Sequence, residues 1–290
     1  MNSRRDFIKQ AALASAGALL LPSFASAKSV KTIGLQLYTL RDLLPKDVEG
    51  VIRKVAAIGY KEVETYGYDP KHGFWGMPAK QLAQLLKSVK LTAPSGHVGV
   101  DPFIRDGKTD ELKANIEALK TIGATYFTVP WLDESLRQSA DDYKKVAEKL
   151  NKAAELCKAA GLRFAYHNHD FEFKQHGGVT GYSILLKETD PKLVSFELDI
   201  YWAVHSGQQP AKIFAAHPGR FPMWHVKDMD KAHPDQNTEV GKGSIDYKQI
   251  FTHASTAGLK HFFVEHENNY QPDELGSIAT SFNYLKQNIK

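Results

Sequence analysis

Strand-like and helix-like segments alternate eight times after residue 30, and this rhythm limits the fold of the chain more than any other feature. Segments rich in apolar residues predict strands at 32–40, 60–65, 91–98, 125–129, 162–169, 193–199, 221–226 and 261–265. Apolar residues at helical spacing predict helices at 48–58, 78–89, 109–122, 141–160, 182–188, 210–216, 246–257 and 272–287. Eight such pairs in about 260 residues predict an α/β protein with the (β/α)₈ TIM-barrel fold in a single domain.

A doubly wound open sheet is the alternative arrangement of alternating strands and helices. Its usual mark is a glycine-rich turn after the first strand, whereas Leu40-Arg41-Asp42 follows the first predicted strand here. No linker, block of charge or low-complexity stretch divides the chain. A closed barrel in one domain is therefore the natural interpretation.

The first 27 residues have the pattern of an export signal. Ser-Arg-Arg-Asp-Phe-Ile-Lys at 3–9 precedes an apolar run at 11–21 and the small residues Ala-Ser-Ala at 25–27. The paired arginines resemble a twin-arginine signal, and the apolar run is short for a membrane span. We therefore predict a twin-arginine signal peptide at 1–27, a barrel at 28–290, a periplasmic or otherwise exported protein, and no membrane attachment after cleavage.

The charge of the chain argues against a nucleic-acid partner. The formal net charge is +4. Three basic residues and one acidic residue in the predicted signal account for two of these charges. The remaining near-neutral chain carries no basic stripe of the kind that binds phosphate backbones.

The segment Phe-Ala-Tyr-His-Asn-His-Asp-Phe-Glu-Phe at 164–173 places two histidines two positions apart. If 162–169 is one strand, His167 and His169 leave it on the same face. A short histidine pair is by itself a weak metal signal, because one core histidine and one solvated histidine would give the same pattern. Its meaning depends on what the other strand ends supply.

Polar side chains stand at the ends of six of the eight predicted strands, where TIM barrels place their active sites. They are Glu64, His97, His167, His169, Glu197, Asp199, His225, Lys227 and Glu265. Taken singly, each has an ordinary alternative, such as a solvated strand-end charge. Taken together, a barrel would bring them to one rim, where imidazoles and carboxylates suit one divalent ion: Mn²⁺, Co²⁺, Mg²⁺ or Zn²⁺.

Five motifs resemble the xylose-isomerase-like TIM-barrel superfamily, which includes sugar isomerases and epimerases, inosose dehydratase and repair enzymes of the endonuclease IV type. They are GLQLYTLRD at 34–42, FELDIYW at 196–202, HVKD at 225–228, EVGKGSIDY at 239–247 and FFVEHE at 262–267. The resemblance implies that Asp199, His225 and Glu265 hold the metal. The chain departs from the family at His167, where a glutamate is usual, and at Trp202, where many members have histidine.

The HNHD sequence at 167–170 is similar to the inosose-dehydratase branch and to exported relatives that cleave 3-keto-glycosides by elimination. The resemblance implies proton abstraction beside a sugar carbonyl through an enediolate. The expected metal ligands are His167, Asp199, His225 and Glu265. His169 and His97, with Glu265, would act on protons or substrate hydroxyls, and Lys227 would offset charge on the developing enolate of the substrate. The expected substrate contacts are Tyr38, Glu64, Trp131 and Trp202.

The leading expectation is a metal-dependent isomerase or epimerase, or a carbon–oxygen lyase, that acts on a small sugar or keto-sugar. Export and the lack of a glycine-rich phosphate cradle favour an unphosphorylated substrate. A non-catalytic, exported carbohydrate-binding barrel is the alternative, because the fifth-strand glutamate is missing. Near-neutral charge and export argue against a repair nuclease. The metal, the sugar, the reaction direction and the oligomeric state stay open.

Overall fold

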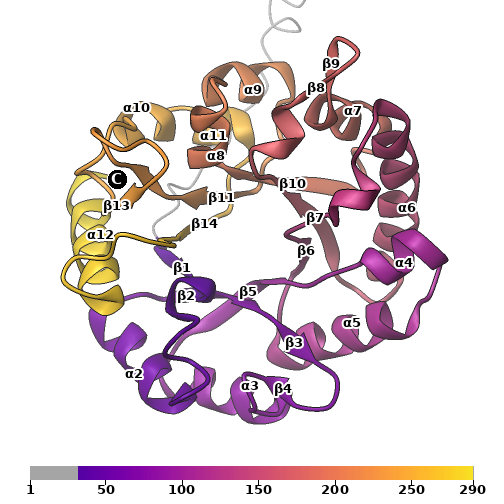
Figure 1. The fold of residues 1–290 in the computed structure, drawn as a ribbon. Helices are drawn as coiled ribbons and strands as arrows, with labels where there is room; N and C mark the ends of the chain where they lie inside the picture. The colour runs from indigo at the N-terminus through magenta and orange to yellow at the C-terminus, as the bar shows by residue number, and fades with distance from the viewer. Residues whose placement is uncertain (1–31, 290) are drawn as a thin grey trace, which may run out of the picture.

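Eight parallel strands close into a barrel in the computed structural model, which describes residues 32–289 (Figure 1). Around the barrel the order is β1-β14-β11-β10-β7-β6-β5-β2. The strands are β1 (Gly34–Gln36), β2 (Glu62–Tyr66), β5 (Thr92–His97), β6 (Tyr126–Val129), β7 (Arg163–His167), β10 (Val194–Asp199), β11 (Met223–Val226) and β14 (His261–Val264). The predicted TIM-barrel fold is confirmed. The predicted signal peptide at 1–27 lies outside the described residues.

Helices surround the barrel on its outer side (Figure 1). They are α2 (Val48–Ile58), α3 (Ala79–Ser88), α4 (Asp101–Asp106), α5 (Asp110–Ile122), α6 (Ala140–Ala159), α7 (Gly181–Glu188), α8 (Ile200–His205), α9 (Pro210–Ala216), α10 (Tyr247–Phe251), α11 (Ala254–Ala257) and α12 (Glu274–Asn288). Local signals fix several ends. The Asp47 carboxylate accepts the Gly50 N–H at the start of α2, and Gly59 ends this helix with a φ of 124°, which glycine tolerates.

The first predicted strand is shorter than expected. Pairing stops at Gln36, whose side chain accepts the N–H of Tyr38 and turns the chain into the 3₁₀ helix η1 (Leu37–Leu40). The strand predicted at 162–169 likewise ends at His167, so the expectation that His169 lies in the strand is wrong. These early ends bring side chains of the following turns over the barrel mouth.

The helical segments also differ from the prediction in places. The short helices α4 and α8 were not expected, and the helix predicted at 246–257 is divided into α10 and α11. Asp199 caps α8 by accepting the N–H of Trp202, so this helix begins directly after a barrel strand. A further 3₁₀ helix, η3 (Phe171–Phe173), follows β7, and another, η2 (Glu134–Leu136), follows β6.

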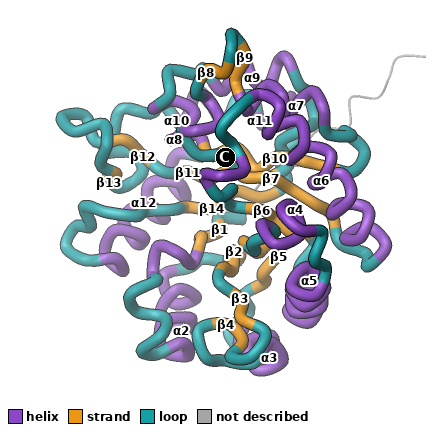
Figure 2. Tube along the Cα trace, turned by 45° about the vertical axis from the view of Figure 1, so that its right-hand side comes forward, coloured by secondary structure: helices purple, strands orange, loops and turns teal. Residues whose placement is uncertain are grey.

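Three two-stranded hairpins extend the loops that leave the carboxyl ends of barrel strands, as Figure 2 shows. Strands β3 (Tyr68–Asp69) and β4 (Gly73–Phe74) follow β2. The other pairs are β8 (Gln175–His176) with β9 (Val179–Thr180), and β12 (Asp228–Met229) with β13 (Asn237–Thr238). Because each hairpin follows a barrel strand, all three belong to the face where barrel enzymes bind substrate.

The interior of the barrel is filled in layers. Tyr126, Ala165, Met223 and Phe263 form a small apolar cluster of their own, separate from the large core that lies between strands and helices. Side chains two positions further along a strand point the same way. The residues that follow this cluster toward the carboxyl ends are therefore the ones to consider as a site. In the described range 32–289, no helix is both long and apolar enough to cross a membrane.

Candidate active site

A polar layer lies directly above the apolar cluster in the barrel interior. His167, His225 and Glu265 each stand two residues beyond a member of that cluster, namely Ala165, Met223 and Phe263. His167 is the last residue of β7, His225 is the residue before the last of β11, and Glu265 follows β14 directly. Strand alternation therefore directs all three side chains to one place, as the sequence predicted from strand ends.

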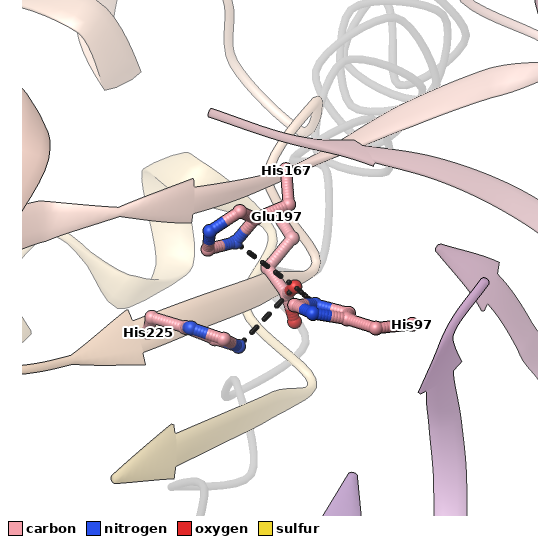
Figure 3. A group of neighbouring side chains, drawn as sticks. All are labelled: His97, His167, Glu197 and His225. Carbon is pink, nitrogen blue, oxygen red and sulfur yellow. Dashed lines mark hydrogen bonds and ion pairs between the residues drawn. The ribbon is translucent and has the colours of Figure 1, made fainter. Parts of the chain in front are cut away.

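Glu197 lies at the centre of three imidazoles (Figure 3). Its Oε2 is 2.8 Å from His97 Nε2, 3.3 Å from His167 Nδ1 and 3.3 Å from His225 Nε2. All four side chains are at least 92 per cent buried, since His97, the most exposed, is 8% accessible. A single carboxylate oxygen thus lies within 3.3 Å of three rings from three other strands and is hydrogen-bonded to that of His97.

Glu64 forms a second carboxylate support below these rings. Its Oε2 is 2.7 Å from His225 Nε2 and 3.1 Å from His97 Nε2. Gln36 and Ser95 donate further hydrogen bonds to the same carboxyl group. Glu64 is fully buried and does not line the pocket, so the expectation of a substrate contact is replaced by a supporting position.

The neighbouring charges shift the pKa values of Glu64 and Glu197 in opposite directions. Burial and the neighbouring Glu64 charge raise the pKa of Glu197 to about 7. Burial alone would raise the pKa of Glu64 as well, but the His97 and His225 imidazoles lower it. Burial alone would lower the pKa of His97, but Glu64 and Glu197 raise it to about 9. His97 is therefore held in its protonated form at neutral pH.

The other nitrogen of His225 faces a different group of oxygens. Its Nδ1 is 3.0 Å from Glu265 Oε2 and 3.9 Å from Asp199 Oδ2. These three ligand atoms lie within 4.8 Å of one another, and all three residues are buried. His167 Nε2 is 3.9 Å from the same Asp199 oxygen. Asp199 Oδ2 and His167 Nδ1 accept or donate no well-directed hydrogen bond within the described part of the chain.

This donor set fits a divalent cation. Two carboxylate oxygens and two imidazole nitrogens are ligand types that Zn²⁺, Mn²⁺ and Co²⁺ share. Carboxylates on the far side of the rings are the usual support for metal-bound histidines, and Glu64 occupies such a place at His225. Of the four predicted ligands, Asp199, His225 and Glu265 therefore converge, whereas His167 groups with His97, Glu197 and His225 and approaches the first set only through Asp199.

Lys227 balances part of the acidic charge. Its Nζ is 2.8 Å from Glu265 Oε2, 3.2 Å from Asp199 Oδ2 and 3.1 Å from Glu267 Oε1. Burial alone would raise the pKa of Glu265, but this ammonium and His225 hold it well below its usual range. Lys227 is fully buried and does not line the pocket, whereas a substrate-facing position had been expected.

His169 sits in a turn among aromatic rings. Its ring stacks on Phe171 with centroids 5.6 Å apart and meets the edge of Trp131 at 4.9 Å. Trp202 lies on another side at 5.7 Å. Burial, together with the charge of Lys227, lowers the pKa of His169 to about 3, so the ring is neutral at pH 7.

A cavity of about 750 Å³ opens above this layer. Seven of the predicted site residues line it: Tyr38, His97, Trp131, His167, His169, Trp202 and Glu265. Tyr66, Tyr68 and Glu267 line it too. Tyr38 and Trp131 are 40% and 47% exposed, which is high for large apolar side chains. Aromatic faces at a pocket mouth suit the apolar faces of ring-shaped ligands.

Two buried residues around the histidine pair were not predicted. Asn168 lies between His167 and His169 and bonds to the backbone of Asp199. Glu172 accepts hydrogen bonds from the Tyr166 hydroxyl and the His169 N–H. The sequence indicates their importance only through their polarity, since both lie in a segment rich in aromatic residues.

Comparison with known proteins places these observations in a family. The family model described as xylose isomerase-like TIM barrel matches residues 52–288. An inosose dehydratase of Geobacillus thermodenitrificans is 26% identical over 173 residues, which cover 53% of this chain and 55% of that protein. One of Lacticaseibacillus casei is 27% identical over 150 residues, covering 46% and 49%. The chain thus spans about half the length of the curated relatives it matches.

Solved structures extend the similarity over the barrel. A sugar phosphate isomerase/epimerase from Parabacteroides distasonis superposes with a TM-score of 0.76 at 28% identity, covering 92% of this chain and 98% of that one. The IOLI protein with a bound zinc atom superposes with a TM-score of 0.71 at 16% identity, covering 89% and 98%. The second similarity concerns the fold alone.

Proposed function

The chain belongs to the xylose isomerase-like TIM barrel family, and we propose that it is a divalent-metal-dependent enzyme that removes a proton next to the carbonyl of an uncharged sugar or keto-sugar. The observation that carries this proposal is the convergence of Asp199, His225 and Glu265 ligand atoms within 4.8 Å of one another, with Glu265 lining the pocket. The bound zinc named for the IOLI protein is consistent with a metal at a barrel of this kind.

The residues that would hold the ion are His167, Asp199, His225 and Glu265. A divalent ion bound there would supply Lewis acidity and so make the carbon–hydrogen bond beside a substrate carbonyl more acidic. Lys227 does not prevent such binding, because Glu267 Oε1 at 3.1 Å can keep the ammonium paired while Asp199 and Glu265 bind the ion.

His169 is the proposed base. It lines the pocket, it is neutral because burial lowers its pKa to about 3, and aromatic rings on three sides fix its orientation. A neutral imidazole accepts a proton through its free nitrogen. His97 is protonated and bonded to two carboxylates, which suits donation to a substrate oxygen rather than proton removal.

We favour elimination over epimerisation as the course of the reaction. Epimerisation needs a second base on the opposite face of the substrate, and the family's fifth-strand glutamate is His167 in this chain. In an elimination, the proton passes from carbon to His169, and the carbon–hydrogen electrons form a double bond. The bond from the neighbouring carbon to its oxygen substituent breaks, and that oxygen leaves with its electrons and takes up a proton from His97. The name of the inosose dehydratase relatives also denotes a lyase.

The charges around the pocket support an uncharged substrate. Its lining carries the acidic side chains of Glu111, Asp170, Glu265 and Glu267. Arg41 is the only arginine or lysine of that lining among the described residues, and it already donates to the Tyr38 and Glu267 carbonyl oxygens and to Tyr270. A phosphate group would meet carboxylates without a free cation to bind it.

The deciding experiment follows a keto-sugar or 3-keto-glycoside incubated with the protein in D₂O, with and without a chelator. We expect an unsaturated keto-sugar, release of water or an aglycone, and loss of turnover in the chelator that added Mn²⁺ or Co²⁺ restores. Deuterium uptake with every carbon–oxygen bond intact would instead indicate an isomerase or epimerase. Turnover that chelation leaves unchanged would contradict the proposed mechanism.

A non-catalytic carbohydrate-binding barrel is the second candidate. One observation favours it: the Lys227 ammonium lies within 3.2 Å of both Asp199 and Glu265, so a cation of the chain itself neutralises the two carboxylates. This candidate predicts sugar binding that is indifferent to metal. We also propose export through the twin-arginine pathway on the strength of residues 3–27.

A further inference from the structure

We infer that Asn168 is a positioning residue for the metal site, because its side chain clamps the backbone of Asp199. The inference rests on the proposed metal-binding role of Asp199. Asn168 is fully buried between the two histidines of the HNHD sequence, and no role in proton transfer or substrate contact involves it.

The clamp continues a strand ladder beyond its end. Strands β7 and β10 pair in register up to His167 opposite Glu197, and there β7 stops. The N–H and carbonyl groups of Asp199 on β10 would then lack a backbone partner on the side of β7. Asn168 Oδ1 accepts the Asp199 N–H at 3.1 Å, and its Nδ2 donates to the Asp199 carbonyl oxygen at 3.3 Å. One side-chain amide thus takes the place of a peptide group.

Three constraints then act on Asp199. Its backbone is held by Asn168 on one side and by the β11 register, opposite His225, on the other. Its Oδ1 accepts the Trp202 N–H at 2.9 Å. Only Oδ2 is left, and it lies 3.9 Å from both His167 Nε2 and His225 Nδ1. Asn168 therefore limits the positions that this oxygen can take relative to the two imidazoles.

The competing explanation is that Asn168 only satisfies buried backbone groups and contributes to stability. The chain offers a matched control for it. Asn151 on α6 makes the same kind of double contact away from the pocket, donating to the Glu188 carbonyl at 3.1 Å and accepting the Asp190 N–H at 2.8 Å. Its removal deletes two side-chain to backbone hydrogen bonds without touching a proposed ligand.

The test is calorimetric titration of Co²⁺ into the full chain, with the visible spectrum of bound Co²⁺ as a second readout. Wild type is compared with Asn168→Ala and Asn151→Ala, and unfolding temperatures are recorded without metal. Loss of a residue that orients metal ligands commonly weakens binding by about 10- to 100-fold. We expect such a loss and an altered spectrum in Asn168→Ala, with both readouts unchanged in Asn151→Ala.

A second variant keeps the test decisive if Asn168→Ala does not fold. Asn168→Asp retains the side-chain volume and the acceptor for the Asp199 N–H but loses the donor. Weaker Co²⁺ binding in this variant would support the clamp, because the added negative charge by itself favours a cation. Wild-type affinity and spectrum in both variants, or equal losses in Asn151→Ala, would overturn it. A wild-type chain that binds no Co²⁺ would overturn the proposed function, and this inference with it.

Discussion

Glu64 Oε2 lies 2.7 Å from His225 Nε2, on the side of the ring that faces away from Asp199 and Glu265. A carboxylate in this place accepts the Nε2 proton and fixes the orientation of the ring, so that Nδ1 faces the Glu265 and Asp199 oxygens. Glu64 on β2 thus fixes the direction in which His225 Nδ1 faces, although β2 does not adjoin β11 in the barrel.

The first prediction concerns this support. In Glu64→Gln, the amide cannot accept from His225, Gln36 and Ser95 at once, so Co²⁺ affinity should fall by about 10- to 100-fold. Calorimetric titration measures the fall. Glu62→Gln is the matched control, because Glu62 makes a similar contact with His261 Nδ1 at 2.9 Å at the first residue of the same strand. Equal affinity in the two variants would refute the orienting role.

The second prediction concerns the ligands. Elemental analysis of the wild type should give about one divalent ion per chain, and His225→Ala and His167→Ala should each lose most of it. The surface histidine variant His205→Ala, which removes a contact with Asp235, serves as the control and should keep the ion. Metal that is lost only in His225→Ala would remove His167 from the ligand set and assign it to substrate contact.

The third prediction separates the base from the ligands. Replacing His169 with glutamine should lower kcat by about 10²- to 10⁴-fold, the range typical of a lost general base, while metal content stays as in the wild type. Because its pKa of about 3 keeps His169 neutral, its titration should add no acid limb to the rate between pH 5 and 8. The measurements are steady-state rates against pH and deuterium exchange at the substrate carbon. Unchanged exchange in the variant would exclude His169 as the base.

Much of the barrel, and the meeting of Asp199, His225 and Glu265 at one rim, could be predicted because both depend on short-range patterns. At 165–167, 223–225 and 263–265 the sequence shows an inward apolar residue followed two positions later by a polar one on the same face. Asp199 and His225 needed only the rule that parallel strands end at one rim. The family resemblance added the identity of the ligands, not their geometry.

The remaining features depend on contacts between distant strands. That Glu197 contacts three imidazoles from β5, β7 and β11 follows from the curvature of the barrel, which spacing along the chain does not express. Lys227 was expected to face substrate, but three carboxylates hold its ammonium below the pocket. His169 lies outside its predicted strand, because β7 ends at His167 and the Asn168 side chain, not a backbone group, pairs with the Asp199 backbone.

The fourth prediction concerns export. If residues 3–27 act as a twin-arginine signal, conservative replacement of both Arg4 and Arg5 by lysine should retain the precursor inside the cell. Cell fractionation and the N-terminal sequence of the exported protein would test this, with cleavage expected after Ala27. The control variant replaces Lys9, which lies outside the arginine pair, with arginine. Equal export of both variants would contradict the assignment.

The last prediction uses the buried carboxyl group of Glu172 as a pH-dependent element of stability. Burial raises its pKa from 4.5 to about 7, although the Tyr166 hydroxyl at 2.6 Å and the His169 N–H at 2.8 Å both donate to it. A carboxyl group whose pKa is higher in the folded state stabilises the fold fully below pH 4.5. This stability is lost as the pH rises to 7, because the unfolded chain then ionises more readily.

Glutamine at position 172 has no charge to lose and can keep both contacts, accepting the His169 N–H and donating to the Tyr166 oxygen. The free energy of unfolding of Glu172→Gln should therefore exceed that of the wild type by an amount that grows between pH 4.5 and 7 to about 3 kcal/mol and then stays level. Denaturant unfolding from pH 4 to 9, with chelator present, measures the difference. Glu155→Gln on an exposed position of α6 should change stability by less than about 0.5 kcal/mol at every pH. A difference for Glu172→Gln that does not vary with pH would show that folding leaves the pKa of this carboxyl group unchanged and would contradict the prediction.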